Sequence, residues 1–208
     1  MRSRGLSDKQ RAFLGRIAII AIDVTELLSL LGNLILVTGA ARSGKSEFAE
    51  RLAEQHKGIV TYIATARRNS QDRDWQARIE HHRQRRPSHW QLQEVPLAIS
   101  ACLEQSNQPQ NCLLLDSLGT WVANTLDESD TDWDHRRQAF LRQAGNFQGT
   151  CILVAEETGW GVVPAYPSGR LFRDRLGELT RHVGAIADKT YLIVAGHSLN
   201  LTEIAAPL

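Results

Sequence analysis

The residues best suited to chemistry are the eight from Gly39 to Ser46, which match the pattern G-x-x-x-x-G-K-[ST] at every position. In such a loop the backbone wraps around phosphate groups, and its N–H groups point at them from the positive end of the next helix. We expect catalytic Lys45 to reach the β- and γ-phosphate oxygens and the Ser46 hydroxyl to bind Mg²⁺. The pattern therefore predicts a nucleoside triphosphate site made of Gly39, Ala40, Ala41, Arg42, Ser43, Gly44, Lys45 and Ser46.

A loop of this type needs a second metal ligand, usually an acid at the end of a neighbouring apolar strand. Asp116 ends the apolar run 112–115 and meets that description. An aspartate before a helix is also a favoured N-cap, and residues from Leu118 onward are expected to be helical. The two roles are compatible, and we predict that Asp116 lies at the phosphate or metal site.

The segment 67–86 holds seven arginines and three acidic residues, a local net charge of +4 in a chain whose formal net charge is +1. A solvated helix face is the usual explanation, but arginine without lysine also suits bidentate contacts with phosphate. His81 and His82 lie within the segment. Adjacent histidines on a helix point about 100° apart, so the two side chains are poorly placed to bind one metal ion together. A single histidine that acts on a phosphate group fits the neighbouring arginines and the P-loop better.

Short apolar runs alternate with amphipathic stretches from residue 33 onward, which predicts an α/β fold with a mostly parallel sheet flanked by helices. The expected strands are 34–38, 60–64, 91–95, 112–116, 151–155 and 190–194. The expected helices are 45–56, 74–86, 97–105, 118–126, 133–147 and 170–187, with a polar loop at 127–132. We therefore predict one P-loop domain over residues 33–208.

Residues 1–32 form an N-terminal extension with apolar residues at helical spacing, which is typical of an amphipathic helix. Arg16, Asp23 and Glu26 interrupt the apolar run, so no stable membrane span is expected. The alternatives are a peripheral extension without chemistry and a helix that docks on a membrane surface or partner.

The composition sets further limits on function. With 24 basic and 23 acidic residues, a nucleic-acid partner is not expected. The three cysteines are widely spaced and form no CxxC, which favours buried free thiols in a reducing, cytoplasmic compartment over disulfides or zinc.

Several motifs in order make the chain resemble the bifunctional adenosylcobinamide kinase/adenosylcobinamide-phosphate guanylyltransferases of cobalamin biosynthesis. The resemblance covers about residues 33–196. It rests on the runs 35–46, 62–65, 77–90, 115–118 with Asn124, 157–164, 170–174 and 187–196.

The resemblance implies that the protein phosphorylates the aminopropanol hydroxyl of adenosylcobinamide with ATP or GTP. It then transfers GMP from GTP, through a guanylyl-histidine at His81, to give adenosylcobinamide-GDP. It also implies a recombinase-like P-loop fold, Mg²⁺ with the nucleotides, and a homo-oligomer, specifically a trimer. The implied nucleotide contacts beyond the P-loop are Thr65, Ala66, Arg67, Gln84, Arg85, Arg86, Pro87, Glu94 and Asp116.

Two alternatives belong to other functional classes. A monofunctional P-loop small-molecule kinase would transfer phosphate to an alcohol without forming a covalent nucleotide. A non-catalytic nucleotide-binding module would show no turnover of GTP in the presence of cobinamide.

Overall fold

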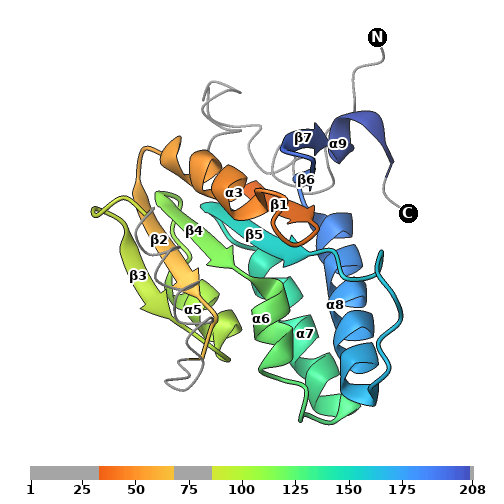
Figure 1. The fold of residues 1–208 in the computed structure, drawn as a ribbon. Coiled ribbons are helices and arrows are strands. Elements are labelled where there is room, and N and C mark those ends of the chain that lie inside the picture. Colours follow the sequence, from red (N-terminus) through yellow and green to blue (C-terminus); the bar gives the residue numbers. More distant parts are fainter. Residues whose placement is uncertain (1–32, 68–85, 207–208) are drawn as a thin grey trace.

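The computed structural model describes residues 33–67 and 86–206, and these form a seven-stranded sheet in the order β3-β2-β4-β5-β1-β6-β7 (Figure 1). The first six strands pair in parallel, and β7 pairs antiparallel with β6. The strands are β1 (Asn33–Gly39), β2 (Ile59–Ala64), β3 (Gln91–Glu94), β4 (Asn111–Asp116), β5 (Thr150–Glu156), β6 (Lys189–Val194) and β7 (His197–Asn200). The mostly parallel α/β fold predicted from the sequence is confirmed.

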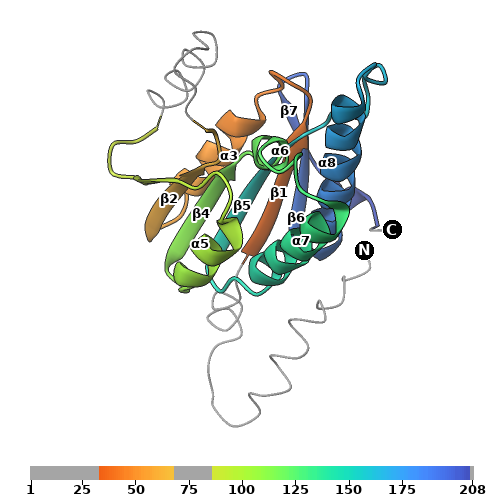
Figure 2. The same ribbon diagram turned by 90° about the horizontal axis from the view of Figure 1, so that it is seen from below.

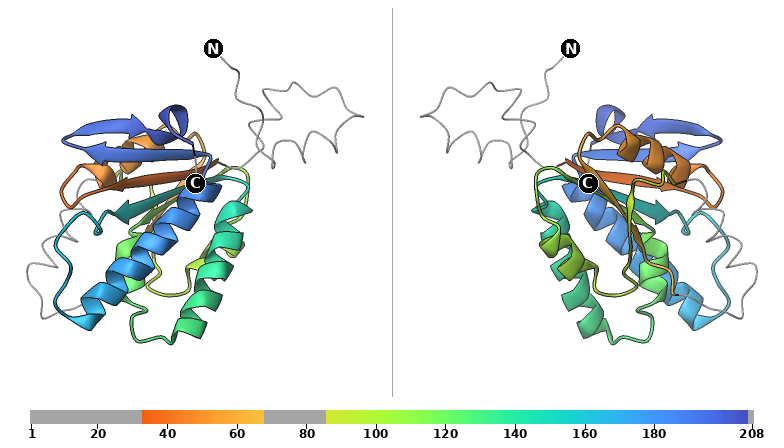
Figure 3. Two further views of the ribbon diagram at one scale, coloured as in Figure 1. Left: turned by 90° about the vertical axis from the view of Figure 1, so that its right-hand side faces the viewer. Right: turned by 90° about the vertical axis from the view of Figure 1, so that its left-hand side faces the viewer.

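Helices cover both faces of the sheet, as parallel strands require. They are α3 (Lys45–Glu54), α5 (Ile99–Gln105), α6 (Leu118–Ala123), α7 (Asp130–Gly145), α8 (Pro167–Ile186) and α9 (Leu201–Ile204). Figures 2 and 3 show α5, α6, α7 and α8 gathered on one face, with α7 and α8 side by side, and α3 on the other.

The larger core lies between the sheet and the helices α5–α8. Trp121 and Phe140 are fully buried in it, with ring centroids 4.9 Å apart, and Trp133 packs against the same indole. On the opposite face Ala49 and Ala53 of α3 pack on the alternate residues of the same strands. This small-residue contact brings α3, and the loop before it, close to the sheet.

Most element boundaries differ from the predicted ones by one to three residues, and the larger differences have local causes. Helix α6 ends at Ala123, not Leu126, and α7 begins at Asp130, inside the expected loop, because Ser129 caps it by accepting a hydrogen bond from the Asp132 N–H. Helix α8 begins three residues early, with Pro167 in its first turn. Strand β7 and helix α9 were not predicted. The expected helix 74–86 lies outside the described residues except for Arg86.

All three cysteines are free and buried, which confirms the prediction of apolar thiols without disulfides. Burial raises the pKa of the Cys112 thiol to about 12 from an ordinary value of 9.0. The folded protein holds this thiol in its neutral form, whereas the unfolded chain can ionise it above about pH 9. The contribution of Cys112 to stability is therefore complete below about pH 9 and is lost as the pH rises toward 12.

We therefore expect the free energy of unfolding to fall with pH between about 9 and 12, with Cys112 contributing up to about 1.4 kcal/mol per pH unit. Urea denaturation of the wild type and Cys112→Ala at several pH values measures this. The variant should show a shallower alkaline decline, whatever its stability at neutral pH. Parallel curves for the two proteins would contradict the assignment.

Candidate nucleotide site

The P-loop follows β1 at the carboxyl edge of the sheet and leads directly into α3. Gly39 has no room for a side chain, because a Cβ there would lie 2.4 Å from the Ile193 carbonyl oxygen. Arg42 and Gly44 adopt left-handed backbone conformations, with φ of 60° and 93°. These two turns give the loop the curvature with which P-loops surround phosphates.

Lys45 is only 5% exposed, although it carries a charge. Its Nζ donates to the Ala40 carbonyl of the same loop at 3.4 Å, a long contact for a buried cation. The Ser43 hydroxyl is also buried, and it has no hydrogen-bond partner within the described residues. A buried ammonium and a spare hydroxyl in one backbone loop are suited to receive an anion.

The register of the strands brings two other predicted site residues, Glu94 and Asp116, to the same edge of the sheet as the P-loop. Ala64, the last residue of β2, pairs with Glu94 on one side and with Asp116 on the other. Asp116 pairs with Val154 of β5, and Gly39 pairs with Glu156 two residues further along β5. Asp116 therefore lies at the same carboxyl edge of the sheet as the P-loop, with β5 between the two.

Asp116 points to the face of the sheet that α3 covers, because it alternates with Leu114 and Cys112, which pack there. Its carboxylate accepts a hydrogen bond from the Tyr62 hydroxyl at 3.1 Å. The Arg86 guanidinium lies over the Tyr62 ring, 4.2 Å from its centroid. Burial, followed by the Asp116 charge, raises the pKa of Tyr62 well above its usual value, so the phenol remains a donor to the carboxylate.

Asp116 is not the cap of the helix that follows. The N-cap of α6 is Ser117, whose hydroxyl accepts from the Thr120 N–H at 3.3 Å. The capping alternative for Asp116 was therefore wrong, and its carboxylate instead accepts from the Tyr62 hydroxyl.

The turns after three strands are joined by a hydrogen-bond network around Thr65 and Asn124. The buried Thr65 hydroxyl donates to the Ser117 carbonyl at 2.9 Å and accepts from the Ser117 N–H at 3.1 Å. The Asn124 amide donates to the carbonyls of Thr65 and Pro96, at 2.8 and 3.0 Å. Arg67 donates to the Asn124 carbonyl at 3.2 Å, while its side chain stays exposed. The predicted contacts Thr65, Ala66 and Arg67 thus lie on a fixed turn.

Glu157 connects the end of β5 to the P-loop strand. Its carboxylate accepts from the Thr38 hydroxyl at 2.9 Å, and its N–H donates to the Gly39 carbonyl at the same distance. Tyr62 and Glu157 were not predicted as site residues, and Asn124 was identified only through the family resemblance. The pair of glutamates that follows the apolar run 151–155 is the signal that points to Glu157.

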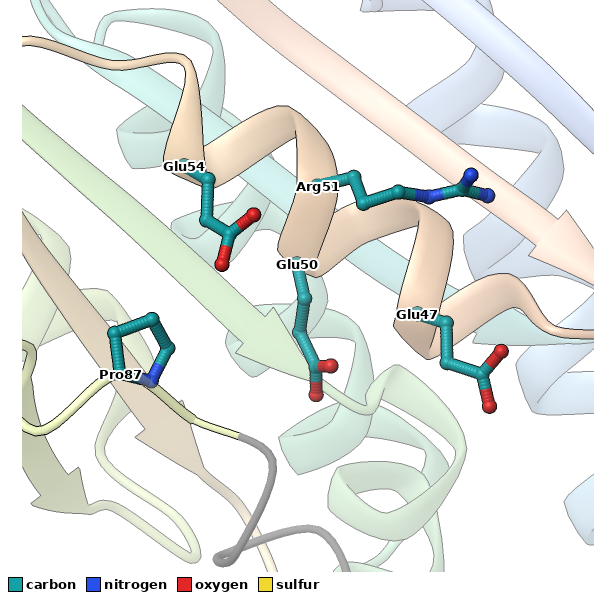
Figure 4. Close-up of a pocket in the computed structure, with 5 residues that line it drawn as sticks. All are labelled: Glu47, Glu50, Arg51, Glu54 and Pro87. Carbon is teal, nitrogen blue, oxygen red and sulfur yellow. The ribbon is translucent and has the colours of Figure 1, made fainter.

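Pro87 lies beside α3, where it lines a pocket of about 350 Å³ with Glu47, Glu50, Arg51 and Glu54 (Figure 4). Figure 4 shows the three carboxylates along one side of the helix and Arg51 pointing away. Three acidic side chains would repel phosphate groups, so this pocket is not the phosphate site.

The remaining predicted residues fall in two groups. Glu94 is exposed at the end of β3, at the same edge of the sheet. His81, Gln84 and Arg85 lie outside the described residues. Within the described ranges there is no group of three or more His, Cys, Asp or Glu side chains arranged to hold a metal ion. No helix in those ranges is long and apolar enough to cross a membrane.

Replacing Tyr62 by phenylalanine removes the hydroxyl that Asp116 accepts from. We expect the free energy of unfolding to fall by about 1.5 to 3 kcal/mol, the usual effect of losing a hydrogen bond to a charged group. Chemical denaturation at neutral pH measures it. Tyr191→Phe, which removes a hydroxyl from β6, three strands away from β4, is the control; an equal loss in both variants would show that the Asp116 contact is not responsible.

The sheet topology, the P-loop at the end of β1 and the acid at the end of β4 define a P-loop nucleotide-binding protein. The model of the family "cobinamide kinase / cobinamide phosphate guanyltransferase" matches residues 35–201. The chain belongs to this family.

Two curated relatives agree with the family match. The bifunctional adenosylcobalamin biosynthesis protein CobP of Pseudomonas aeruginosa is 41% identical over 162 residues, covering 77% of this chain and 92% of that protein. The corresponding CobU protein of Escherichia coli is 35% identical over 177 residues, covering 78% and 96%. A solved protein of Pyrococcus horikoshii shares the fold alone, with 8% identity and a TM-score of 0.52 over 90% of this chain and 97% of that one.

Proposed function

We propose that this protein phosphorylates adenosylcobinamide with ATP or GTP and then transfers GMP from GTP onto the new phosphate, giving adenosylcobinamide-GDP. The observation that carries the proposal is the shared edge of the sheet. The P-loop, Asp116 and the turn at Thr65 lie there together, in a chain whose family is defined by these two activities.

In the kinase step the acceptor hydroxyl oxygen attacks the γ-phosphorus, and the bond from that phosphorus to the β–γ bridging oxygen breaks. The P-loop N–H groups and Lys45 hold the β- and γ-phosphates and stabilise the charge that develops on them. Lys45 suits this role because it is already buried inside the loop and makes only one long contact there within the described residues.

We propose that Ser46 and Asp116 hold the Mg²⁺ that accompanies the nucleotide. A hydroxyl and a carboxylate are oxygen ligands of the kind Mg²⁺ prefers, and it retains several waters in such sites. Asp116 is suited to the role because it projects on the α3 face and its carboxylate is oriented by Tyr62. The bound ion would neutralise phosphate charge during transfer.

In the second step we propose that His81 attacks the α-phosphorus of GTP and releases pyrophosphate. The phosphate of the first product then attacks the same phosphorus, the P–N bond breaks, and the imidazole is restored. Arg86 supports this role because it is stacked on Tyr62 beside Asp116 and is five residues from His81 along the chain. Five residues span at most about 18 Å, so the chain keeps His81 within that distance of Arg86.

The test is mass measurement of the intact protein after exposure to GTP, together with an assay of cobinamide phosphorylation. We expect the protein mass to rise by one guanylyl group and cobinamide to be phosphorylated. Phosphorylation without a mass change would instead indicate a monofunctional kinase, and turnover of neither kind would indicate a nucleotide-binding module.

The family resemblance also leads us to propose a homotrimer, which light scattering of the purified protein would test.

The three free buried thiols support a reducing compartment, and we propose the cytoplasm.

A further inference from the structure

The segment between β5 and α8 exposes an unusual density of apolar side chains. Ten large hydrophobic residues of the described ranges are exposed, and four of them fall within seven positions: Trp160, Val162, Val163 and Tyr166. Val162 is 95% exposed and Trp160 is 65% exposed. Clustered exposed apolar groups commonly mark a binding surface.

This segment is held at both ends. At its start, Glu157 is hydrogen-bonded to Thr38 and Gly39 of the P-loop strand. At its end, the Arg170 guanidinium donates to the carbonyls of Pro164 and Ala165 at 3.1 and 2.7 Å. The apolar side chains are therefore displayed from an anchored backbone, which reduces the entropy lost on binding a ligand.

The segment also lies next to the place where phosphate is transferred. Figures 1 and 3 show it leaving the sheet at the same edge as the P-loop and running from there to the start of α8. An acceptor hydroxyl must reach the γ-phosphate that the P-loop holds, so the rest of the acceptor must rest on a surface beside that loop.

We propose that Trp160, Val162, Val163 and Tyr166, here called the apolar loop, dock the corrin ring of the acceptor. A corrinoid is a broad macrocycle with methyl groups between its peripheral amide chains, so part of it needs flat and apolar contacts that the polar nucleotide site does not offer. The indole and phenol rings supply such contacts. This inference rests on the proposed function, because it concerns the second substrate of the same site.

The experiment compares Trp160→Ala and Val162→Asp with the wild type. Each variant should raise the KM for cobinamide in the kinase assay by about tenfold or more, since full burial of such a side chain has about that effect. The KM for ATP and the extent of protein guanylylation by GTP without corrinoid should stay within about twofold. These side chains are exposed, so both variants should fold.

Ile59→Ala is the matched control. Ile59 is also an exposed apolar residue, but it begins β2 and so lies at the opposite edge of the sheet. It should leave both KM values unchanged.

Equilibrium dialysis with cobinamide tests docking separately from catalysis. Weaker cobinamide binding by both loop variants supports the inference, even if the wild type phosphorylates nothing and the proposed function fails. Unchanged cobinamide binding in both variants overturns it. A smaller oligomer in light scattering, with cobinamide affinity per chain unchanged, would also overturn it and would indicate a contact between copies of this chain.

Discussion

Replacing Lys45 by alanine is expected to slow the phosphorylation of cobinamide by about 10³-fold or more. The transferred phosphoryl group would lose the Lys45 cation, and single cationic contacts in phosphoryl transfer are worth effects of that size. The loss should appear mainly in kcat, because charge on the phosphoryl oxygens is redistributed as the transition state is reached. Steady-state kinetics with saturating ATP measure it.

Lys57→Ala is the control for this experiment. It removes the same charge from an exposed position after α3 and should leave the rate unchanged. Circular dichroism should verify that Lys45→Ala folds. A folded Lys45→Ala protein that phosphorylates cobinamide at a near-normal rate would show that this loop is not the kinase site.

The second large effect is expected for His81→Ala, which should abolish covalent labelling by GTP that carries its label on the α-phosphate. An imidazole has an ordinary pKa of about 6.5, so much of it is neutral and nucleophilic near pH 7. The label on the wild type should be acid-labile and base-stable, as a phosphoramidate is. The kinase step should persist in the variant, because it does not pass through this residue.

His82→Ala separates the role of His81 from a general effect on the histidine pair. It should retain at least part of the label, because adjacent side chains point in different directions. Labelling of His81→Ala to the wild-type level would place the nucleophile elsewhere.

The parts of the site that could be predicted from the sequence are those carried by contiguous residues. The P-loop is a local pattern between an apolar strand and a helix, and Asp116 ends an apolar run, so both could be placed at the carboxyl edge of a parallel sheet. Tyr62 could not, because it lies within an apolar strand and its hydroxyl has a partner only through the register between β2 and β4. That register is set by packing across the whole sheet.

The differences in element boundaries have equally local causes. The run from Asp130 to Asp132 looks like a polar loop, yet a serine followed by acidic residues is also typical of a helix N-terminus. The capping signal at Ser129 was therefore present in the sequence. Strand β7 and helix α9 have only four residues each, too few for a periodic pattern to emerge.

The position of Asn124 limits how this protein can be re-engineered. One amide holds the turns after β2 and β3, and Thr65 on the first of these turns holds the residue that caps α6. A graft that exchanges the turn at Thr65 alone, for example to change nucleotide preference, would disturb its contacts with both Ser117 and Asn124. The three turns and Asn124 form one transplantable module, and variants should be built and selected with all four changed together.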